Sequence, residues 1–366
     1  MYEKILNYLQ KNIYPFHMPG HKGRAEFFPP EGLQMDLTEI PGMDVLSAPV
    51  GIIGDFQRKA ANFFGASHSF FLVNGASVGN LATVCALVSG RKIFVARNSH
   101  VSLYNGLVIS GASPTYFLPE ITPGGLAGGV SPDTFENLPE NAAVFLVSPT
   151  YEGFVSDIAE IAKRVHARGG ILCVDEAHGA HFPFHAKFPT HALACGADIV
   201  VNSLHKTLPA VSGCGFLHVN SSRVDVARLR FFLNALQTTS PSYMLMAACD
   251  FMLEKLWREP EWFQNYTTRL EKLRKELAAA KKMRLLGSEM IGSSGIFAMD
   301  EGKLLFEVGA PAEEISDFFA REYKLQFEMA QGKHLLAMTS VADTDEGFAR
   351  LVRAATDFSV SSGWCD

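Results

Sequence analysis

Two charged residues stand at the ends of neighbouring apolar segments and could carry out chemistry together. Lys206 comes shortly after the apolar run Ile199–Val201, and Asp175 closes a second run, Ile171–Val174. A lysine amine can hold an aldehyde cofactor as a Schiff base, and a carboxylate can keep a pyridine nitrogen protonated so that the ring takes up electrons. The pair therefore predicts an enzyme that uses pyridoxal 5′-phosphate (PLP).

A turn between a strand-like and a helix-like segment offers a site for the cofactor phosphate. Gly75, Ala76 and Ser77 follow the apolar run Phe70–Val73 and precede a helical pattern. Small residues at such a turn let backbone amides approach a phosphate, and the helix dipole favours its charge. Taken alone, the segment is better explained as a tight turn with Ser77 as the helix N-cap. The phosphate interpretation depends on the lysine and the acid described above.

His100 lies just past another predicted strand, where its imidazole could stack on a pyridine ring. Each of these residues also has an ordinary explanation: a surface or capping role for His100, a helix N-cap for Asp175, a solvated side chain for Lys206. Their joint occurrence on successive strand ends, with Ser203 and His205 beside the lysine, favours the cofactor site.

Other kinds of site are disfavoured. His178 and His181 are three residues apart, but no third metal ligand accompanies them. His17 and His21 are separated by Pro-Gly, which forbids the helix that would align both rings. No serine lies in a nucleophile elbow, and no Walker or dinucleotide glycine fingerprint occurs. We therefore predict no metal site.

The pattern along the chain predicts an α/β fold. The 366 residues exceed one ordinary core, so we expect a large domain and a smaller one. Short strands that are apolar on both faces alternate with helices, which is typical of a mostly parallel, helix-covered sheet. The seven predicted strands are Phe70–Asn74, Ile93–Ala96, Pro114–Leu118, Val144–Ser148, Ile171–Asp175, Ile199–Ser203 and Gly215–Val219.

Composition shifts divide the chain. We predict an N-terminal arm over residues 1–49, a PLP-binding large domain over 50–240 and a small α+β domain over 241–366. The small domain begins after a segment rich in Thr, Ser and Pro, with two long helices followed by short strands, among them 295–299. No internal repeat or low-complexity tract interrupts this organisation.

Charge and cysteine usage bear on partners and compartment. The net charge of −6 and the lack of Lys/Arg runs disfavour nucleic acid and membrane surfaces as partners. No apolar run is long enough to span a bilayer, and residues 1–14 suggest an amphipathic helix, not a signal peptide. The six scattered cysteines fit buried free thiols. We expect a cytoplasmic protein.

With these residues identified, the chain resembles the ornithine/lysine/arginine decarboxylase family of fold-type-I PLP enzymes over roughly residues 15 to 245. It resembles a short form, without the wing and the long C-terminal domain of larger members. The matching segments are His17–Gly23, Asp36–Asp44, Asn74–Asn80, Arg97–His100, Pro149–Gly153, Asp175–His181 and Ser203–Leu208.

The resemblance implies a role for each site residue. Lys206 is the Schiff-base lysine, Asp175 pairs with the pyridine nitrogen and His100 stacks on the ring. The residues implied to hold the phosphate are Ala76, Ser77, Ser203 and His205, and those otherwise implied to bind the cofactor are Gly75, Ala177 and His178. It further implies an aminotransferase-like fold and a homodimer with shared active sites, into which the N-terminal arm and 238–241 reach.

The expected activity is decarboxylation of lysine, ornithine or arginine to a di- or polyamine. A PLP-dependent aminotransferase or β-lyase is the first alternative, and an inactive PLP-binding protein is the second. Aminotransferases of this fold clamp the substrate carboxylate with an arginine of the C-terminal domain, but Arg350 and Arg353 fall inside the final helical pattern. For the distal amine of a basic substrate the sequence offers Glu39, Asp44 and Glu152 without ranking them.

Overall fold

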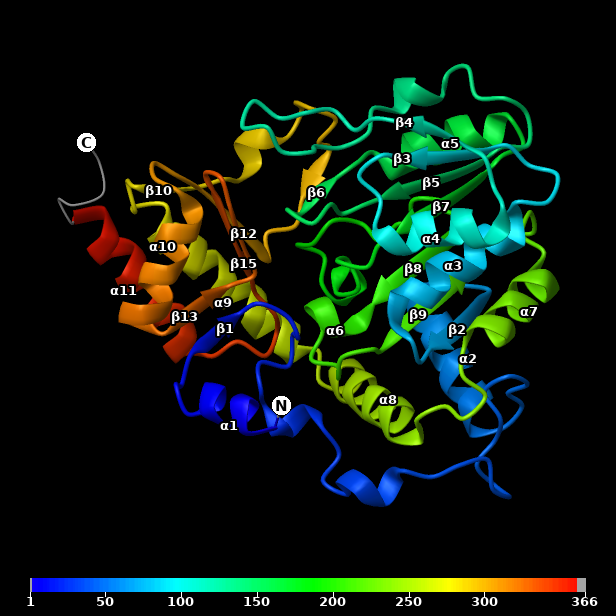
Figure 1. The fold of residues 1–366 in the computed structure, drawn as a ribbon, viewed down its shortest axis with the longest axis horizontal. Coiled ribbons are helices and arrows are strands. Elements are labelled where there is room, and N and C mark those ends of the chain that lie inside the picture. Colours follow the sequence, from blue (N-terminus) through cyan, green and yellow to red (C-terminus); the bar gives the residue numbers. More distant parts are fainter. Residues whose placement is uncertain (1, 361–366) are drawn as a thin grey trace.

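The computed structural model describes residues 2–360, and its largest element is a seven-stranded sheet (Figure 1). The strands are β2 (His68–Leu72), β3 (Ile93–Ala96), β4 (Pro114–Phe117), β5 (Ala143–Val147), β7 (Ile171–Asp175), β8 (Ile199–Ser203) and β9 (Gly215–Val219). Their order is β2-β9-β8-β7-β5-β3-β4, and β9 alone runs antiparallel to its neighbours. The predicted mostly parallel sheet is confirmed, with each strand within two residues of its expected bounds.

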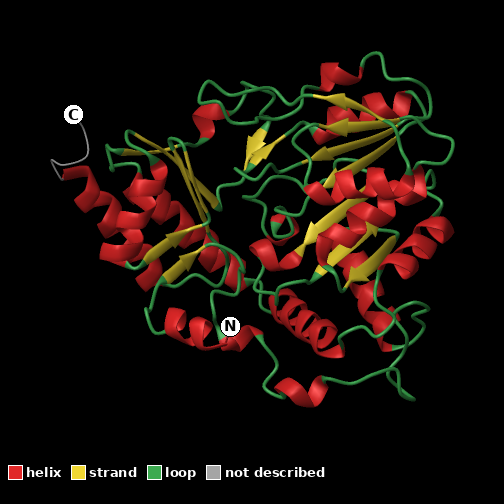
Figure 2. Ribbon diagram, in the orientation of Figure 1, coloured by secondary structure: helices red, strands yellow, loops and turns green. Residues whose placement is uncertain are grey.

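Helices cover both faces of this sheet, which explains why its strands are apolar on both sides (Figure 2). One face packs against α3 (Gly75–Leu87), α4 (Val101–Ser110) and α7 (Val226–Leu236). The other packs against α2 (Ile52–Phe64), α5 (Ile158–Ala167) and α8 (Tyr243–Arg258). Every residue of β7, β8 and β9 is buried as a result.

A smaller α+β body lies beside the large one (Figure 1). Its antiparallel sheet has the order β10-β12-β15-β14, with β10 (Met283–Leu285), β12 (Lys303–Val308), β14 (Met329–Gln331) and β15 (His334–Met338). Its helices include α9 (Glu261–Leu277), α10 (Ala312–Phe318) and α11 (Asp345–Val360). The strand expected over 295–299 is only β11 (Ala298–Met299), which pairs with β6 (Phe154–Val155) and so connects the two bodies.

The N-terminal segment is attached to the smaller body. After α1 (Tyr2–Leu9), strand β1 (Tyr14–Phe16) pairs in parallel with β13 (Leu325–Phe327). The buried amine of Lys22 then donates to three carbonyl oxygens, those of Pro15, His17 and Met338. The motif His17–Gly23 therefore ties the arm to the end of β15. The domain boundaries at 49 and 240 stay a prediction.

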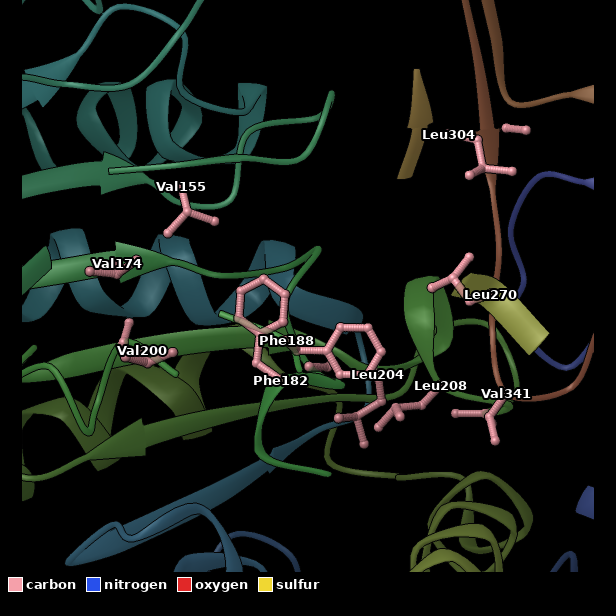
Figure 3. Packing of buried hydrophobic residues seen from close by; sticks show 14 of the residues in the cluster. Val155, Val174, Phe182, Phe188, Val200, Leu204, Leu208, Leu270, Leu304 and Val341 are labelled. Carbon is pink, nitrogen blue, oxygen red and sulfur yellow. The ribbon is translucent and has the colours of Figure 1, made fainter. Parts of the chain in front are cut away.

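One apolar cluster runs from the large sheet into the smaller body, and it supports the short helix α6 (Leu204–Thr207) that follows β8 (Figure 3). Leu204 and Leu208 are fully buried in this cluster, together with Leu270 and Val341 of the smaller body. Removing a leucine side chain from such a position costs about 2–5 kcal/mol. The packing of Leu204 and Leu208 therefore fixes the position of Lys206, which lies in α6.

Two further expectations concern cysteines and membranes. The described cysteines are all unpaired, and Cys195 is the only one of them that is not buried, whereas Cys365 lies outside the described residues. Within residues 2–360, no helix combines the length and the apolar character that a bilayer crossing requires.

Candidate active site

Lys206 and Asp175 meet at one edge of the large sheet. Asp175 is the last residue of β7, Lys206 lies in α6 directly after β8, and the two strands are parallel neighbours. The carboxyl ends of parallel strands open on the same edge, where ligands bind in sheets of this kind. Burial lowers the pKa of the Lys206 amine, and the charges of Asp175 and Glu328 oppose this shift.

Neutral donors hold the Asp175 carboxylate. Asn80 Nδ2 donates to Oδ2 at 2.8 Å, and the Ala177 amide donates to Oδ1 at 3.1 Å. A turn, not a helix, follows Asp175, so the N-cap explanation of this acid is wrong. Neither donor is charged, so these two hydrogen bonds do not pair the buried carboxyl with a cation.

His100 belongs to the same network and is also a helix cap. Its Nδ1 accepts from the Ser102 amide at 3.2 Å at the start of α4 and lies 2.9 Å from Ser102 Oγ, so the capping role is confirmed. Asn80 in turn donates to Ser102 Oγ at 3.0 Å, which links the imidazole to Asp175. Burial lowers the pKa of His100, Asp175 raises it and Lys206 lowers it further, so the ring lies within electrostatic reach of both. Its stacking on a cofactor stays a prediction.

The predicted phosphate turn opens α3 and leaves backbone amides without a side-chain cap. The helix begins at Gly75, with φ of +70°, and its N-cap Asn74 makes no side-chain hydrogen bond to the first turn. Ser77 lies inside the first turn, so the interpretation of Ser77 as N-cap is wrong. Uncapped amides at a helix N-terminus are a ready site for a phosphate.

The second group of predicted phosphate ligands lies against this turn. A Cβ at Gly215 would come within 2.8 Å of the Asn202 carbonyl oxygen and 3.2 Å of the Ala76 nitrogen, so only glycine lets these backbones approach. His205 Nδ1 lies 3.3 Å from the Gly213 nitrogen and 3.4 Å from Ser203 Oγ. The fold thus brings the ends of β2 and β8 together at the beginning of β9.

His178 lies between two lysine amines. Its Nε2 is 3.1 Å from Lys206 Nζ, and its Nδ1 is 2.8 Å from Lys303 Nζ. His181 Nε2 instead contacts Asp300 Oδ1 at 3.1 Å, so the two histidines face different partners. Among residues 2–360, no group of three or more His, Cys, Asp or Glu side chains could hold a metal ion.

Comparison with known proteins places the chain in a family. The family model described as "Orn/Lys/Arg decarboxylase, major domain" matches residues 1–317. The chain belongs to the Orn/Lys/Arg decarboxylase family. It is 30% identical over 376 residues to an arginine decarboxylase of Halalkalibacterium halodurans, with 98% of this chain and 77% of the relative covered. It is 40% identical over 263 residues to the uncharacterized protein YaaO of Bacillus subtilis (strain 168), with 68% of this chain and 55% of YaaO covered.

Solved structures confirm the aminotransferase-like fold of type I PLP enzymes. Lysine decarboxylase A from Pseudomonas aeruginosa superposes with a TM-score of 0.78 at 20% identity, over 91% of this chain and 54% of that one. Serine palmitoyltransferase from Sphingomonas wittichii superposes with a TM-score of 0.69 at 17% identity, over 94% of this chain and 86% of that one. The chain therefore spans little more than half the length of YaaO and of lysine decarboxylase A.

This member of the Orn/Lys/Arg decarboxylase family has three site residues that sequence reasoning missed. Lys303 begins β12, Glu328 lies between β13 and β14, and Tyr151 belongs to a motif whose role was left open. Tyr151 donates its hydroxyl to Glu328 Oε1 at 2.9 Å, and its ring meets His178 edge-on at 5.3 Å. Glu328 Oε2 accepts from the Met18 amide at 3.0 Å. The smaller body and the arm thus complete the site.

Of the three acids proposed for a distal amine, Asp44 is already fully engaged. Its carboxylate accepts from five backbone amides around the start of α2, those of Val45, Val50, Gly51, Ile53 and Gly54. Glu152 is close enough to Lys303 to raise the pKa of that amine, whereas Glu39 is exposed on the arm. Glu328 is a better candidate, since its charge raises the pKa of Lys206 itself.

Proposed function

We propose that this chain is a PLP-dependent decarboxylase of a basic amino acid (lysine, ornithine or arginine) and that it produces a di- or polyamine. One observation carries the proposal: the Lys206 amine lies at the sheet edge within electrostatic reach of Asp175 and of Glu328. The first acid suits a cofactor ring, and the second suits a cationic substrate. Membership of the family and the names of relatives such as arginine decarboxylase support the reaction.

The residues at the edge fit PLP. Lys206 would hold the cofactor aldehyde through its amine, Asp175 would pair with the pyridine nitrogen, and His100 would lie against the ring. The uncapped amides of α3 would take the phosphate, with Ser203 and His205 beside them. When bound, PLP supplies an electron sink for the charge left on the substrate α-carbon. The protein's part is to orient the bond that breaks.

Glu328 is our candidate for recognition of the distal cation. Each of its oxygens accepts one neutral donor, Tyr151 Oη or the Met18 amide, so among residues 2–360 the carboxylate has no charged hydrogen-bond partner. Burial and the charge of Glu328 both raise the pKa of Tyr151, so the phenol stays a donor at neutral pH. A carboxylate with acceptor capacity left attracts the ammonium or guanidinium of a basic side chain.

The contacts of Arg350 support decarboxylation over transamination. Arg350 in α11 donates to the Asn12 carbonyl oxygen and pairs with Glu346, so it points toward the N-terminal segment. Decarboxylation would be favoured by a poorly solvated substrate carboxylate that no arginine clamps. An aminotransferase or β-lyase, and an inactive PLP-binding protein, are the competing functions.

We further propose a cytoplasmic homodimer with shared active sites. Val101, Val108 and Ile109 expose apolar side chains on α4, and exposed apolar patches mark interfaces. The unpaired cysteines suit a reducing compartment. Sedimentation of the purified protein at several concentrations tests the dimer, and a monomer at all of them would contradict it.

A panel of substrates tests the function. The purified protein, supplied with PLP, is mixed separately with carboxyl-labelled lysine, ornithine and arginine, and with neutral amino acids as controls. We expect labelled CO₂ from at least one basic amino acid and none from the neutral ones. Keto-acid formation in the presence of 2-oxoglutarate would show an aminotransferase instead. An absorbance change without any product would show an inactive binder.

A further inference from the structure

Lys303 is a buried charge-bearing residue that none of the proposed steps uses. Only 1% of its surface is exposed, and its amine lies 2.8 Å from His178 Nδ1 and 5.7 Å from the centre of the Tyr151 ring. Gly153 makes room for it: a Cβ there would come within 2.8 Å of Lys303 Cγ. A lysine so deeply buried is rare unless it is paired or has a function.

The hydrogen bonds of His178 constrain the two lysines that flank it. Burial and the charges of Lys303 and Lys206 hold the pKa of His178 well below its usual range, so the imidazole is neutral. A neutral imidazole has one N–H donor and one acceptor nitrogen. The lysine that faces the N–H must accept the hydrogen bond, and only an unprotonated amine can accept. Therefore Lys206 and Lys303 cannot both be ammonium ions while both contacts persist.

We propose that Lys303 is a positioning residue for Lys206: linked through His178, the two amines share one positive charge, so that protonation of Lys303 leaves the Lys206 amine as the free base that can attack an aldehyde. In this arrangement Lys303 donates to Nδ1, and the N–H at Nε2 donates to the lone pair of Lys206. The opposite arrangement is reached by two coupled proton transfers, in which Lys303 gives a proton to Nδ1 while Nε2 gives its proton to Lys206. No net charge moves in or out of the site.

The surrounding charges are consistent with such sharing. Burial lowers the pKa of Lys303 to about 7; Asp300, Glu328 and Glu152 raise it, and Lys206 lowers it. The Lys206 pKa is lowered by burial and raised by Asp175 and Glu328. The titratable groups that face His178 are the two lysines, His100, His205 and the edge-on ring of Tyr151. Two like charges linked by one imidazole titrate as a coupled pair, so each must lower the pKa of the other.

This inference deepens the proposed function and rests on it for the use made of Lys206. Its test needs neither cofactor nor substrate. The protein is labelled at lysine Cε with ¹³C, freed of PLP, and titrated by NMR, and the signals missing from Lys206→Met and Lys303→Met assign the two residues. We expect Lys303 to titrate near pH 7 in the wild type and about one unit higher in Lys206→Met. An unchanged Lys303 titration in Lys206→Met would overturn the proposal.

A chemical readout covers the reciprocal direction. Reductive methylation with formaldehyde and cyanoborohydride, quantified at Lys206 by peptide mass spectrometry, measures how much of this amine is unprotonated at each pH. In Lys303→Met we expect methylation of Lys206 to fall about tenfold below pH 7 and to match the wild type above pH 9, where Lys303 is neutral. The exposed Lys333→Met is the matched control and should change neither curve.

The two outcomes of the methylation experiment differ in shape. A merely structural role for Lys303 would change Lys206 reactivity by the same factor at every pH, and that result would contradict the proposal. If Lys303→Met does not fold, Lys206→Met still decides the question, since Lys206 is only partly buried and coupling is reciprocal. If the substrate panel shows no decarboxylation, the NMR titration and the methylation measurement can still be interpreted. The proposed activity and the proposed coupling of Lys303 to Lys206 can therefore fail independently.

Discussion

The two sides of the candidate site hold their charges in different ways. On the large-body side, Asp175 accepts hydrogen bonds from Asn80 of α3 and from the Ala177 amide in the turn after β7, so all three residues belong to the large body. On the small-body side, Lys303 and Glu328 each contact a residue of the opposite body, His178 and Tyr151 respectively. The first side therefore forms with the large sheet itself, whereas the second forms only where the two bodies meet.

This difference separates two tasks. A cofactor site built within one body keeps its geometry whatever the substrate, which suits a group that stays bound through many cycles. Charges that lie across the junction of the bodies can discriminate substrates, because their placement depends on both bodies at once. The proposed roles of Asp175 and Glu328 follow this division. The predictions below test it by changing one side at a time.

The largest effect is expected at the residue that both sides share. Lys206→Ala should reduce turnover of any substrate by at least about 10³-fold, since the covalent attachment point for the cofactor is lost. Borohydride treatment of the wild type followed by peptide mapping should find the cofactor on Lys206. The exposed Lys187→Ala, which loses only its surface pair with Glu271, is the control. Full activity of Lys206→Ala, or trapping on another lysine, would remove the mechanism.

A change confined to the large-body side should reduce the turnover of every substrate by a similar factor. Asp175→Asn keeps an acceptor for Asn80 but removes the charge. We expect kcat to fall by about 10²–10³-fold for all accepted amino acids, as is usual when one preorganised electrostatic partner is lost. Steady-state kinetics and a cofactor-binding titration measure this. An effect on one substrate only would mean that Asp175 takes part in substrate recognition and would contradict its assignment to the cofactor site.

A change confined to the small-body side should be selective. Glu328→Gln keeps the size of the side chain and its bond from Tyr151 but removes the charge. Charge-assisted hydrogen bonds contribute about 1.5–3 kcal/mol, so kcat/KM for a basic substrate should fall roughly tenfold to a hundredfold.

The control for Glu328→Gln is the exposed Glu314→Gln in α10, which should behave like the wild type. Cofactor affinity is the second readout, because Glu328 has no proposed contact with the cofactor. A loss of cofactor binding equal to that in Asp175→Asn would mean that the two sides are not separate in function.

The same difference explains which parts of the fold the sequence could predict. Strands β7, β8 and β9 are buried on both faces, so their apolar runs identify them without knowledge of their neighbours. Strands β1 and β13 have three residues each and exist through their pairing with one another, far apart in the chain. Such short elements carry no periodic signal of their own.

The candidate site divides in the same way. Asp175 and Lys206 could be predicted because parallel strands place their carboxyl ends on one edge. No comparable rule gives the position of Lys303 at the start of an antiparallel strand, where a single lysine before Leu304 and Leu305 looks like an ordinary solvated end. Glu328 and Asp44 are equally acidic in sequence, and only the structure shows that one faces the site and the other holds a helix.

The smallest effect concerns Asp44, an acid that serves stability and not the site. Burial by itself would raise its pKa, but hydrogen bonds from the amides of Val50, Val45, Gly54 and Gly51 bring it down to about 2, from 3.8. A carboxyl whose pKa is lower in the folded state stabilises the fold above the unfolded value, and the contribution is lost as pH falls toward the folded value. The relevant window is therefore about pH 4 to 2.

Asp44→Ala should lower the free energy of unfolding by about 1–2 kcal/mol at pH 7, the usual effect of losing a helix-capping side chain. Urea denaturation at fixed protein concentration measures it, and the difference from the wild type should shrink as pH falls from 4 to 2. The exposed Asp36→Ala on the same arm should have no such effect. If Asp44→Ala instead kept its stability but lost basic substrates, Asp44 would be a site residue, and substrate recognition would not be confined to the junction of the two bodies.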